Sequence, residues 1–347
     1  MKIKVTIGLL LFICTAFFII AAGKKENGPY KPTYIKLEIP KGWPKPSTDI
    51  FANNPLTEEG FQLGRRLFYD GRLSKDGNFA CATCHQQFAA FATYDHDFSH
   101  GFNNSFTTRN APGLFNLAWS PLLQWDGGVN HIEVQPLAPL TAHNEMAENI
   151  DSVLRKLRKD TSYTRLFKAA FGTNIINSQR MLKALAQFTG SLVSYNSKYD
   201  KVIRGEATFT PGEQRGYEFF KLKCATCHKE PLFTDNSFRN NGLALNAALN
   251  DYGRMKITGN ATDSLKFKVP SLRNVALTFP YMHDGRLYSI GQALEHYRSG
   301  IITTQPTLDT ALKNRIAMNN TEKNNLMYFL FTLTDTTFTK NPRYRMP

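Results

Sequence analysis

Acidic residues are scarce in this chain of 347 residues, which has 28 Asp and Glu against 42 Lys and Arg and a net charge of +14. The basic residues are nevertheless scattered, and no run of five or six like charges occurs. Such runs are typical of basic arms that bind nucleic acid, so we predict no nucleic-acid partner. The 42% of hydrophobic residues can supply the cores of two domains of ordinary size, which excludes a disordered or fibrous chain.

Alternation of apolar and polar residues, the pattern of a half-buried strand, is missing from the sequence. Helical signals occur instead, and they recur in the two halves of the chain. Thr57 is an N-cap for a helix that runs to Phe68, and Thr210 begins a capping box with Pro211 at the first helical position.

Each half also ends with a helical pattern. In the first half, apolar residues at helical spacing run from Met181 to Leu192, and in the second half Thr321 is the expected cap of a helix that continues to Leu333. The chain is therefore an internal repeat. We predict an all-α fold with two domains and an irregular linker over residues 200–209.

Cysteine is rare, and four of the five cysteines lie in two identical Cys-Ala-Thr-Cys-His motifs at residues 81–85 and 224–228. In a C-x-x-C-H motif the two thiols can add to the vinyl groups of one haem, and the adjacent His can bind the iron. A zinc site and a redox dithiol are the alternatives for a C-x-x-C pair. The duplication, with His after each pair, favours two haem c groups. The attachment residues are then Cys81, Cys84, Cys224 and Cys227, and the proximal ligands are His85 and His228.

The fifth cysteine, Cys14, lies in an apolar N-terminal run that follows Lys2 and Lys4. We assign residues 1–23 to an export signal, with an uncleaved membrane anchor as the alternative, and expect a periplasmic protein. Removal of Lys2 and Lys4 lowers the net charge from +14 to +12. Residues 24–50 are rich in Lys and Pro, which predicts an extended arm or tether.

Several longer segments also stand out: RNAP at 109–112, QWDGG at 124–128, QPLAP at 135–139, NEM at 144–146, FKVPSLRNV at 267–275 and PYMHDG at 280–285. With these segments the chain resembles the bacterial dihaem cytochrome c peroxidase family, whose members include the MauG-like enzymes. The resemblance implies a cytochrome c domain with a peroxide-reactive haem at residues 51–205, and a second one with an electron-transfer haem at 206–347.

The family resemblance also implies roles for single residues. Glu145 matches the catalytic carboxylate and Gln135 the amide of the peroxide pocket. A carboxyl in a partly apolar pocket can accept a proton from bound peroxide and return it to the leaving oxygen. Trp125 matches the tryptophan that relays electrons between the haems. The alternatives are structural: the sequence alone favours a surface acid for Glu145 and a loop residue for Gln135, and a buried core residue is the alternative for Trp125.

Sixth ligands to the two irons follow from the same resemblance. His100 is the candidate for a displaceable ligand of the first haem, with His96 close to it in sequence. Tyr297 occupies the position where peroxidases of the family usually have Met and MauG-like members have Tyr. A phenolate ligand favours ferric and higher states, whereas Met favours ferrous iron. Met255, Met282 and His296 are the alternatives to Tyr297.

A calcium ion between the domains is a further implication, with Asn110, Thr278 and Pro280 as its ligands, the last two through backbone carbonyls. Oxygen ligands suit this cation. The alternative for Asn110 is an Asx turn.

The expected activity is reduction of hydrogen peroxide to water with electrons from a small cytochrome c or copper protein. The positive charge favours an acidic donor. A MauG-like oxidase that acts on a protein or organic substrate, and a non-enzymatic dihaem electron-transfer protein, are the alternatives. A homodimer is compatible with each of them.

Overall fold

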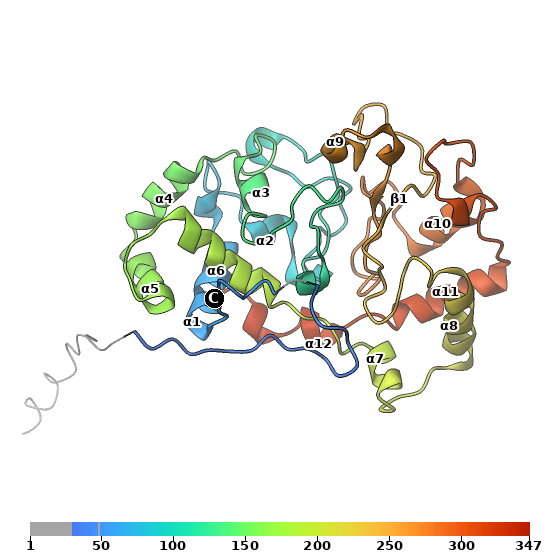
Figure 1. Cartoon of the computed structure of the whole chain (residues 1–347), viewed down its shortest axis with the longest axis horizontal. Helices are drawn as coiled ribbons and strands as arrows, with labels where there is room; N and C mark the ends of the chain where they lie inside the picture. The colour runs from blue at the N-terminus through green and yellow to red at the C-terminus, as the bar shows by residue number, and fades with distance from the viewer. Residues whose placement is uncertain (1–29, 48) are drawn as a thin grey trace, which may run out of the picture. The chain divides into compact units, whose positions relative to one another are not determined.

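Helices dominate the fold, as the sequence predicts (Figure 1). The computed structural model describes residues 30–47 and 49–347, so the predicted export segment 1–23 lies outside the described residues. Within the described part, no helix is long and apolar enough to cross a membrane. The α-helices are α1 (Glu58–Phe68), α2 (Cys81–Cys84), α3 (Leu137–Thr141), α4 (Ile150–Arg158), α5 (Thr161–Phe171), α6 (Ser178–Gly190), α7 (Lys198–Ile203), α8 (Pro211–Lys223), α9 (Met255–Thr258), α10 (Ile290–Glu295), α11 (Asn320–Phe331) and α12 (Thr336–Thr339).

Strands are limited to one antiparallel pair, β1 (Phe238–Arg239) and β2 (Phe267–Lys268). In its register, Phe238 lies opposite Lys268. This short ribbon places β2 beside the loop that contains Trp125, because the Lys268 N–H donates to the Trp125 carbonyl at 2.7 Å.

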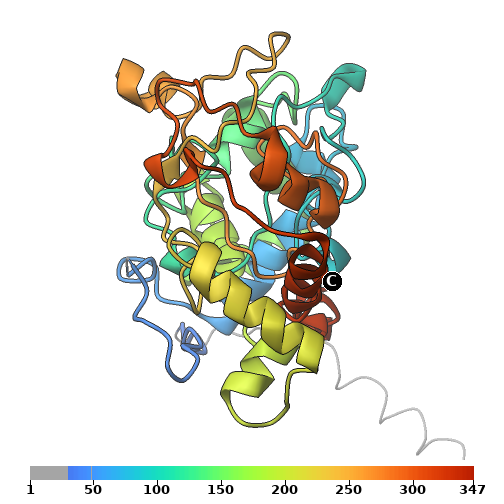
Figure 2. The ribbon, with the colours of Figure 1, turned by 90° about the vertical axis from the view of Figure 1, so that its right-hand side faces the viewer.

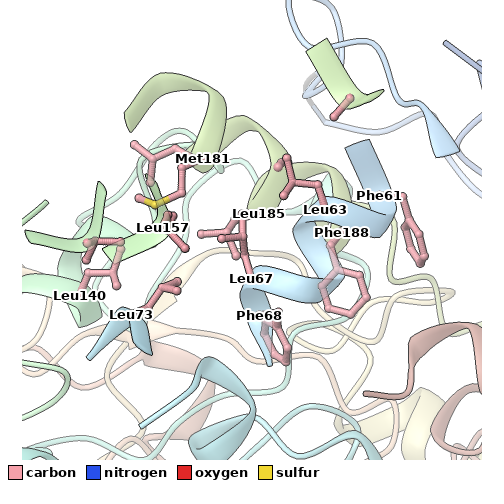
Figure 3. Packing of buried hydrophobic residues seen from close by; sticks show 14 of the residues in the cluster. Phe61, Leu63, Leu67, Phe68, Leu73, Leu140, Leu157, Met181, Leu185 and Phe188 are labelled. Carbon is pink, nitrogen blue, oxygen red and sulfur yellow. The ribbon is translucent and has the colours of Figure 1, made fainter. Parts of the chain in front are cut away.

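The first half is built on the crossing of α1 and α6. Thr57 caps α1 as predicted, with its side chain accepting from the Gly60 N–H. A Cβ at Gly64 would lie 1.9 Å from the Ala184 carbonyl oxygen, so only glycine allows the two helices to approach this closely. Phe68 of α1 packs on Phe188 of α6, with ring centroids 5.1 Å apart, in the buried cluster shown in Figure 3.

The second half repeats this construction with α8 and α11, which lie side by side in Figures 1 and 2. The predicted capping box at Thr210 is present at the start of α8. A Cβ at Gly216 would lie 1.9 Å from the Asn325 carbonyl oxygen, and Phe220 and Phe329 have ring centroids 5.1 Å apart. The internal repeat is therefore confirmed at the level of helix packing.

Two local predictions are wrong. The N-cap of α11 is Asn319, which forms a capping box with Glu322, and Thr321 lies inside the first turn. The side-chain amide oxygen of Asn319 accepts from the Glu322 N–H at 2.9 Å, so the helix is capped two residues before Thr321. Residues 200–203 belong to α7 and not to the linker, because Ser197 and Asp200 form a capping box that starts this helix.

The Lys- and Pro-rich segment after residue 31 runs extended along the body of the protein and makes specific contacts with it. Tyr34 forms a β-bridge with Thr57. Trp43 packs edge-on against Trp119 at 5.2 Å, and the Arg273 guanidinium lies 4.4 Å from the Trp43 ring. The segment thus covers part of the hydrophobic surface.

The C-terminal segment packs on the first half, although the sequence assigns all of residues 206–347 to the second domain. Phe338 of α12 is 3% exposed and belongs to the same buried cluster as α1 and α6. The Tyr69 hydroxyl donates to the Tyr344 carbonyl at 2.8 Å. Burial of these aromatic rings ties the chain end back to its beginning.

Candidate active site

A large cavity, of about 780 Å³, lies between the two halves of the repeat. Both Cys-Ala-Thr-Cys-His motifs line it, together with the loops 107–126 and 267–283. The residues predicted for the site that line the cavity are Cys81, Cys84, His85, Asn110, Trp125, Gln135, Glu145, Cys224, Cys227, His228, Thr278, Pro280 and Tyr297. The fold therefore brings together nearly all of the predicted site residues.

Each motif forms one tight turn. The His85 N–H donates to the Cys81 carbonyl at 2.9 Å, and the His228 N–H donates to the Cys224 carbonyl at 3.0 Å. Both histidines therefore follow their cysteines with the same local geometry.

The imidazole rings are also held in the same way. His85 Nδ1 lies 2.8 Å from the Phe91 carbonyl, and His228 Nδ1 lies 3.1 Å from the Phe233 carbonyl. Burial lowers the pKa of both rings, so they are neutral near pH 7. With Nδ1 donating to a carbonyl, the lone pair of Nε2 is left for a metal, which is the arrangement of an axial ligand.

The cysteine thiols are neutral as well. Burial raises the pKa of Cys81 and of Cys224 to about 12, and it raises the pKa of Cys84 and Cys227 in the same direction. A redox dithiol needs a stabilised thiolate, which lowers the pKa of the thiol. Attachment to haem through thioether bonds needs no thiolate in the folded protein, so buried neutral thiols are compatible with it.

Glu145 and Gln135 lie on the side of the cavity near the first motif, on either side of α3. Burial raises the pKa of the Glu145 carboxyl, whose charge acts on the Cys84 thiol. The Glu145 backbone is fixed at both ends, since its N–H donates to the Ala142 carbonyl at 3.0 Å and its carbonyl accepts from the Phe102 N–H at 2.7 Å. Gln135 Oε1 is buried without a hydrogen-bond partner.

The residues of the cavity fit two haem groups. Two neutral imidazoles, two pairs of buried thiols and an unpartnered amide oxygen all face one space. A buried acceptor without a partner costs free energy unless a ligand satisfies it. A bound molecule with an O–H donor beside Gln135 would satisfy it.

Trp125 joins the two halves beside this space. Its indole N–H donates to the Asn110 carbonyl at 2.8 Å, and its own carbonyl accepts from the Lys268 N–H of β2 at 2.7 Å. The ring is thus held at the boundary between the two haem motifs.

An ion-pair cluster that the sequence did not single out fixes the same boundary. Arg109 donates to Asp126 at 2.6 Å and, through two nitrogens, to Asp251 at 2.6 and 2.9 Å. Although burial raises the pKa of Asp251, the hydrogen bond and charge of Arg109 lower it to about 2. Asp126 follows Trp125 in the sequence, so Arg109 ties the tryptophan loop to the second half.

Comparisons with known proteins agree with this geometry. Residues 58–208 match the family model described as di-haem cytochrome c peroxidase. The chain is 37% identical over 286 residues to the methylamine utilization protein MauG of Methylorubrum extorquens, covering 81% of this chain and 79% of that protein. The chain belongs to the di-haem cytochrome c peroxidase and MauG family.

Other members of the family are similar over nearly the whole chain. Cytochrome c551 peroxidase of Nitrosomonas europaea is 30% identical over 363 residues, covering 100% of this chain and 95% of that protein. A crystal structure of a MauG-like protein associated with microbial copper homeostasis superimposes with a TM-score of 0.81 at 33% identity, covering 90% of this chain and 99% of that chain. Membership of this di-haem family implies two haem c groups and an oxidoreductase of the peroxidase or MauG type.

In this di-haem protein, Tyr297 lines the second half of the cavity. It lies in a π-helical turn, His296–Gly300, that continues α10, and such turns often occur at functional sites. Burial raises the pKa of Tyr297, whereas a hydrogen bond with Asn241 lowers it, and the thiols of the second motif are close enough to act on it.

The alternatives to Tyr297 are placed differently. His296 Nε2 lies 3.0 Å from the Asn241 carbonyl, and neither His296 nor Met255 is among the lining residues. Met282 does line the cavity, and its sulfur accepts from Asn241 Nδ2 at 3.3 Å. Tyr297 and Met282 are therefore the two of these candidates that line the cavity.

His100 does not face the cavity. It is exposed, and its ring packs against Phe106 at 4.6 Å and against His96 at 5.6 Å. His96 is exposed as well, and neither histidine lines the cavity. The prediction of an iron ligand here thus has no support in the structure, because the 94–106 loop carries both rings at the surface.

The three predicted calcium ligands all line the cavity. Asn110 Nδ2 donates to the carbonyls of His96 and Asp97 at 3.2 and 3.3 Å, so the amide oxygen is the atom left for a cation. Thr278 and Pro280 line the same cavity. Across residues 30–47 and 49–347, no group of three His, Cys, Asp or Glu side chains could hold a metal ion, so the predicted calcium site would depend on amide and carbonyl oxygens alone.

Proposed function

We propose that this protein is an exported, periplasmic dihaem peroxidase that reduces hydrogen peroxide to water with electrons from a small cytochrome c or copper protein. The observation that carries the proposal is the pair of Glu145 and Gln135 in the same cavity as His85. A carboxyl with a raised pKa and an unpartnered amide oxygen are the groups that peroxide cleavage requires.

The chain's residues divide this work between them. Cys81, Cys84 and His85 would hold a haem, which would supply the iron at which peroxide is reduced. Glu145 would accept a proton from one peroxide oxygen and donate it to the other, which would leave as water. Gln135 Oε1 accepts a hydrogen bond from the substrate and orients it. The balance is one peroxide, two protons and two electrons for two waters.

Cys224, Cys227 and His228 would hold the second haem, which would take electrons from the donor. Trp125 would lie between the two haems, since its indole N–H donates to the Asn110 carbonyl and its carbonyl accepts from the Lys268 N–H. A calcium ion bound by Asn110, Thr278 and Pro280 would hold the two sides of this route together, since these residues come from both halves of the chain.

The test of the proposal is Glu145→Gln, which keeps the size of the side chain and removes the titrating group. We expect both haems to be retained and the rate of peroxide reduction to fall by about a hundredfold or more. Glu133→Gln is the matched control, because Glu133 lies two residues before Gln135 but does not line the cavity. Equal rates in Glu145→Gln and the control would exclude Glu145 from the mechanism.

The pH profile gives a second readout. Deprotonated Glu145 must take the proton from peroxide, so the rate in the unmodified protein should fall as the pH drops through the raised pKa of this carboxyl. Glu145→Gln should lack that inflection, whereas Glu133→Gln should keep it.

A MauG-like oxidase is the second candidate function. It is favoured by Tyr297 in the cavity wall and by the 37% identity to a MauG protein. Steady turnover of peroxide with a reduced cytochrome or copper protein supports the peroxidase. A long-lived oxidised state after peroxide, without turnover of such donors, supports the oxidase, and no reaction of either kind supports a plain electron-transfer protein.

A further inference from the structure

Lys268 differs from the other cationic side chains that line the cavity. Most of these have a carboxylate partner: Arg109 pairs with Asp126 and Asp251, Arg239 with Asp235 and Asp309, and Lys256 lies 3.5 Å from Asp251. Lys223 is exposed at the end of α8. Lys268 lies inside the cavity wall, and no carboxylate of the described chain lies within ion-pair distance of it.

The ammonium group of Lys268 has spare hydrogen-bonding capacity. It donates to the Leu122 carbonyl at 2.7 Å, which uses one of its three donors. Burial lowers the pKa of Lys268 to about 8, and the negative charge of Asp126 only partly opposes this. A buried ammonium with unfilled donors costs free energy unless an anion accompanies it.

The neighbouring charges do not supply that anion. Asp126 is held by Arg109 at 2.6 Å. Arg254 donates to the carbonyls of Asp126 and Gly127 at 2.9 and 3.1 Å and adds a second positive charge. On β1, the residue opposite Lys268 is Phe238, which is uncharged. The surroundings of Lys268 therefore carry excess positive charge and favour an anionic ligand.

The groups that occupy the cavity supply such anions, since each haem c has two propionate carboxylates. Lys268 connects the two haem sites. Two residues after it is Pro270, whose backbone contacts the His228 ring, and the Lys268 ammonium donates to the Leu122 carbonyl in the first half. We propose that Lys268 binds a haem propionate and raises the reduction potential of that haem. The inference rests on the two haems of the family and not on the choice between peroxidase and oxidase.

The physical consequence is electrostatic. A buried positive charge beside the propionate stabilises ferrous over ferric iron, because reduction removes one positive charge from the haem. Loss of the ammonium leaves the propionate unneutralised, so the reduction potential of that haem falls below its value in the unmodified protein. Lys268 is thus a positioning and charge-compensating residue, and its effect is read in potentials.

The experiment is a spectroelectrochemical titration of the protein with both haems attached, in the unmodified chain and in Lys268→Met, Lys268→Arg and Lys256→Met. In Lys268→Met we expect the ferric-to-ferrous equilibrium of one haem to shift about tenfold toward ferric, which is about 59 mV for one electron. Lys268→Arg should leave the reduction potential of that haem close to its value in the unmodified protein, because arginine keeps the positive charge. Lys256→Met is the matched control, since Lys256 lines the same cavity but its side chain is 47% exposed and screened by water.

Equal shifts in Lys268→Met and Lys256→Met would overturn the proposal. The unmodified protein provides a second test that needs no variant. An ammonium paired with propionate stays charged well above pH 8. Neither reduction potential should therefore change through titration of Lys268 between pH 7 and about pH 9.5. A potential that falls as the pH rises through about 8 would show an unpaired Lys268 and contradict the proposal. Peroxide turnover is measured separately and tests the proposed function. Its result does not depend on whether Lys268 binds a propionate, so failure of one proposal can be distinguished from failure of the other.

Discussion

Replacement of Arg109 should lower the free energy of unfolding of the protein, because this side chain neutralises two buried carboxylates at once. The side chains of Asp126 and Asp251 are 8% and 5% exposed, whereas that of Arg109 is 21% exposed. Replacement by Gln leaves both carboxylates without their main partner. Breaking a buried ion pair in this way costs about 3–5 kcal/mol. Lys256 remains 3.5 Å from Asp251, so we expect a loss near the lower end, about 3 kcal/mol.

The pKa of Asp251 gives an independent magnitude. It falls from 3.8 to about 2 in the folded chain, and 1.36 kcal/mol for each pH unit corresponds to about 2 kcal/mol of stability. Since the folded pKa lies below the unfolded one, this stability is complete above pH 3.8 and is lost as the pH falls toward 2. The difference between Arg109→Gln and the unmodified protein should therefore be largest near pH 7 and should narrow below about pH 4.

The assay is urea unfolding at several pH values, followed by circular dichroism and by the haem absorption. Arg204→Gln is the control, because Arg204 pairs with Glu206 at the surface, with side chains 32% and 52% exposed. Such a pair contributes about 0–1 kcal/mol. The reasoning is refuted if Arg109→Gln loses no more stability than Arg204→Gln at pH 7.

Three further predictions concern the packing and the site. Gly216→Ala should lower the free energy of unfolding in urea by about 3 kcal/mol or more, because its Cβ would lie 1.9 Å from a backbone oxygen. Gly291→Ala on α10, where no atom lies nearer than 3.7 Å, should raise that free energy by up to about 1 kcal/mol, and equal effects of the two variants would contradict the close helix crossing. Chelation of calcium should slow electron exchange between the haems and lower activity, with recovery on adding calcium; a metal-free protein of full activity would refute the site at Asn110. Tyr297→Met should raise the potential of the second haem and introduce the near-infrared band of His/Met ligation, and a His/Met spectrum already present in the unmodified protein would reject Tyr297 as a ligand.

Much of the helical framework was predictable from local signals. Thr57 and Thr210 are caps whose side chains accept backbone N–H groups within the same turn, so the sequence contains all the necessary information. The error at Thr321 arose because Asn319 is an equally good cap two residues earlier. The two motifs predicted the haem residues for the same reason, since the whole chemistry lies within five consecutive positions.

The contacts across the cavity were not predictable in the same way. Arg109 and Asp251 are 142 positions apart, and nothing in either segment indicates the other. Lys268 is an ordinary lysine in the sequence, and only the burial around β2 makes it unusual. The spacing from His85 does not show which way the loop that carries His100 turns. The packing of Phe338 on the first half likewise depends on burial that no local sequence pattern indicates.

The most direct test of the account is the amount of peroxide needed to oxidise the fully reduced protein, followed by the absorption of both haems. Two haem c groups that deliver electrons to one peroxide site should both become ferric with one equivalent of hydrogen peroxide, because each peroxide takes two electrons. Glu145→Gln should reach the same endpoint about a hundredfold more slowly. Oxidation of one haem alone, or a rate unchanged in Glu145→Gln, would contradict the central claim that the two motifs and Glu145 form a single peroxide-reducing site.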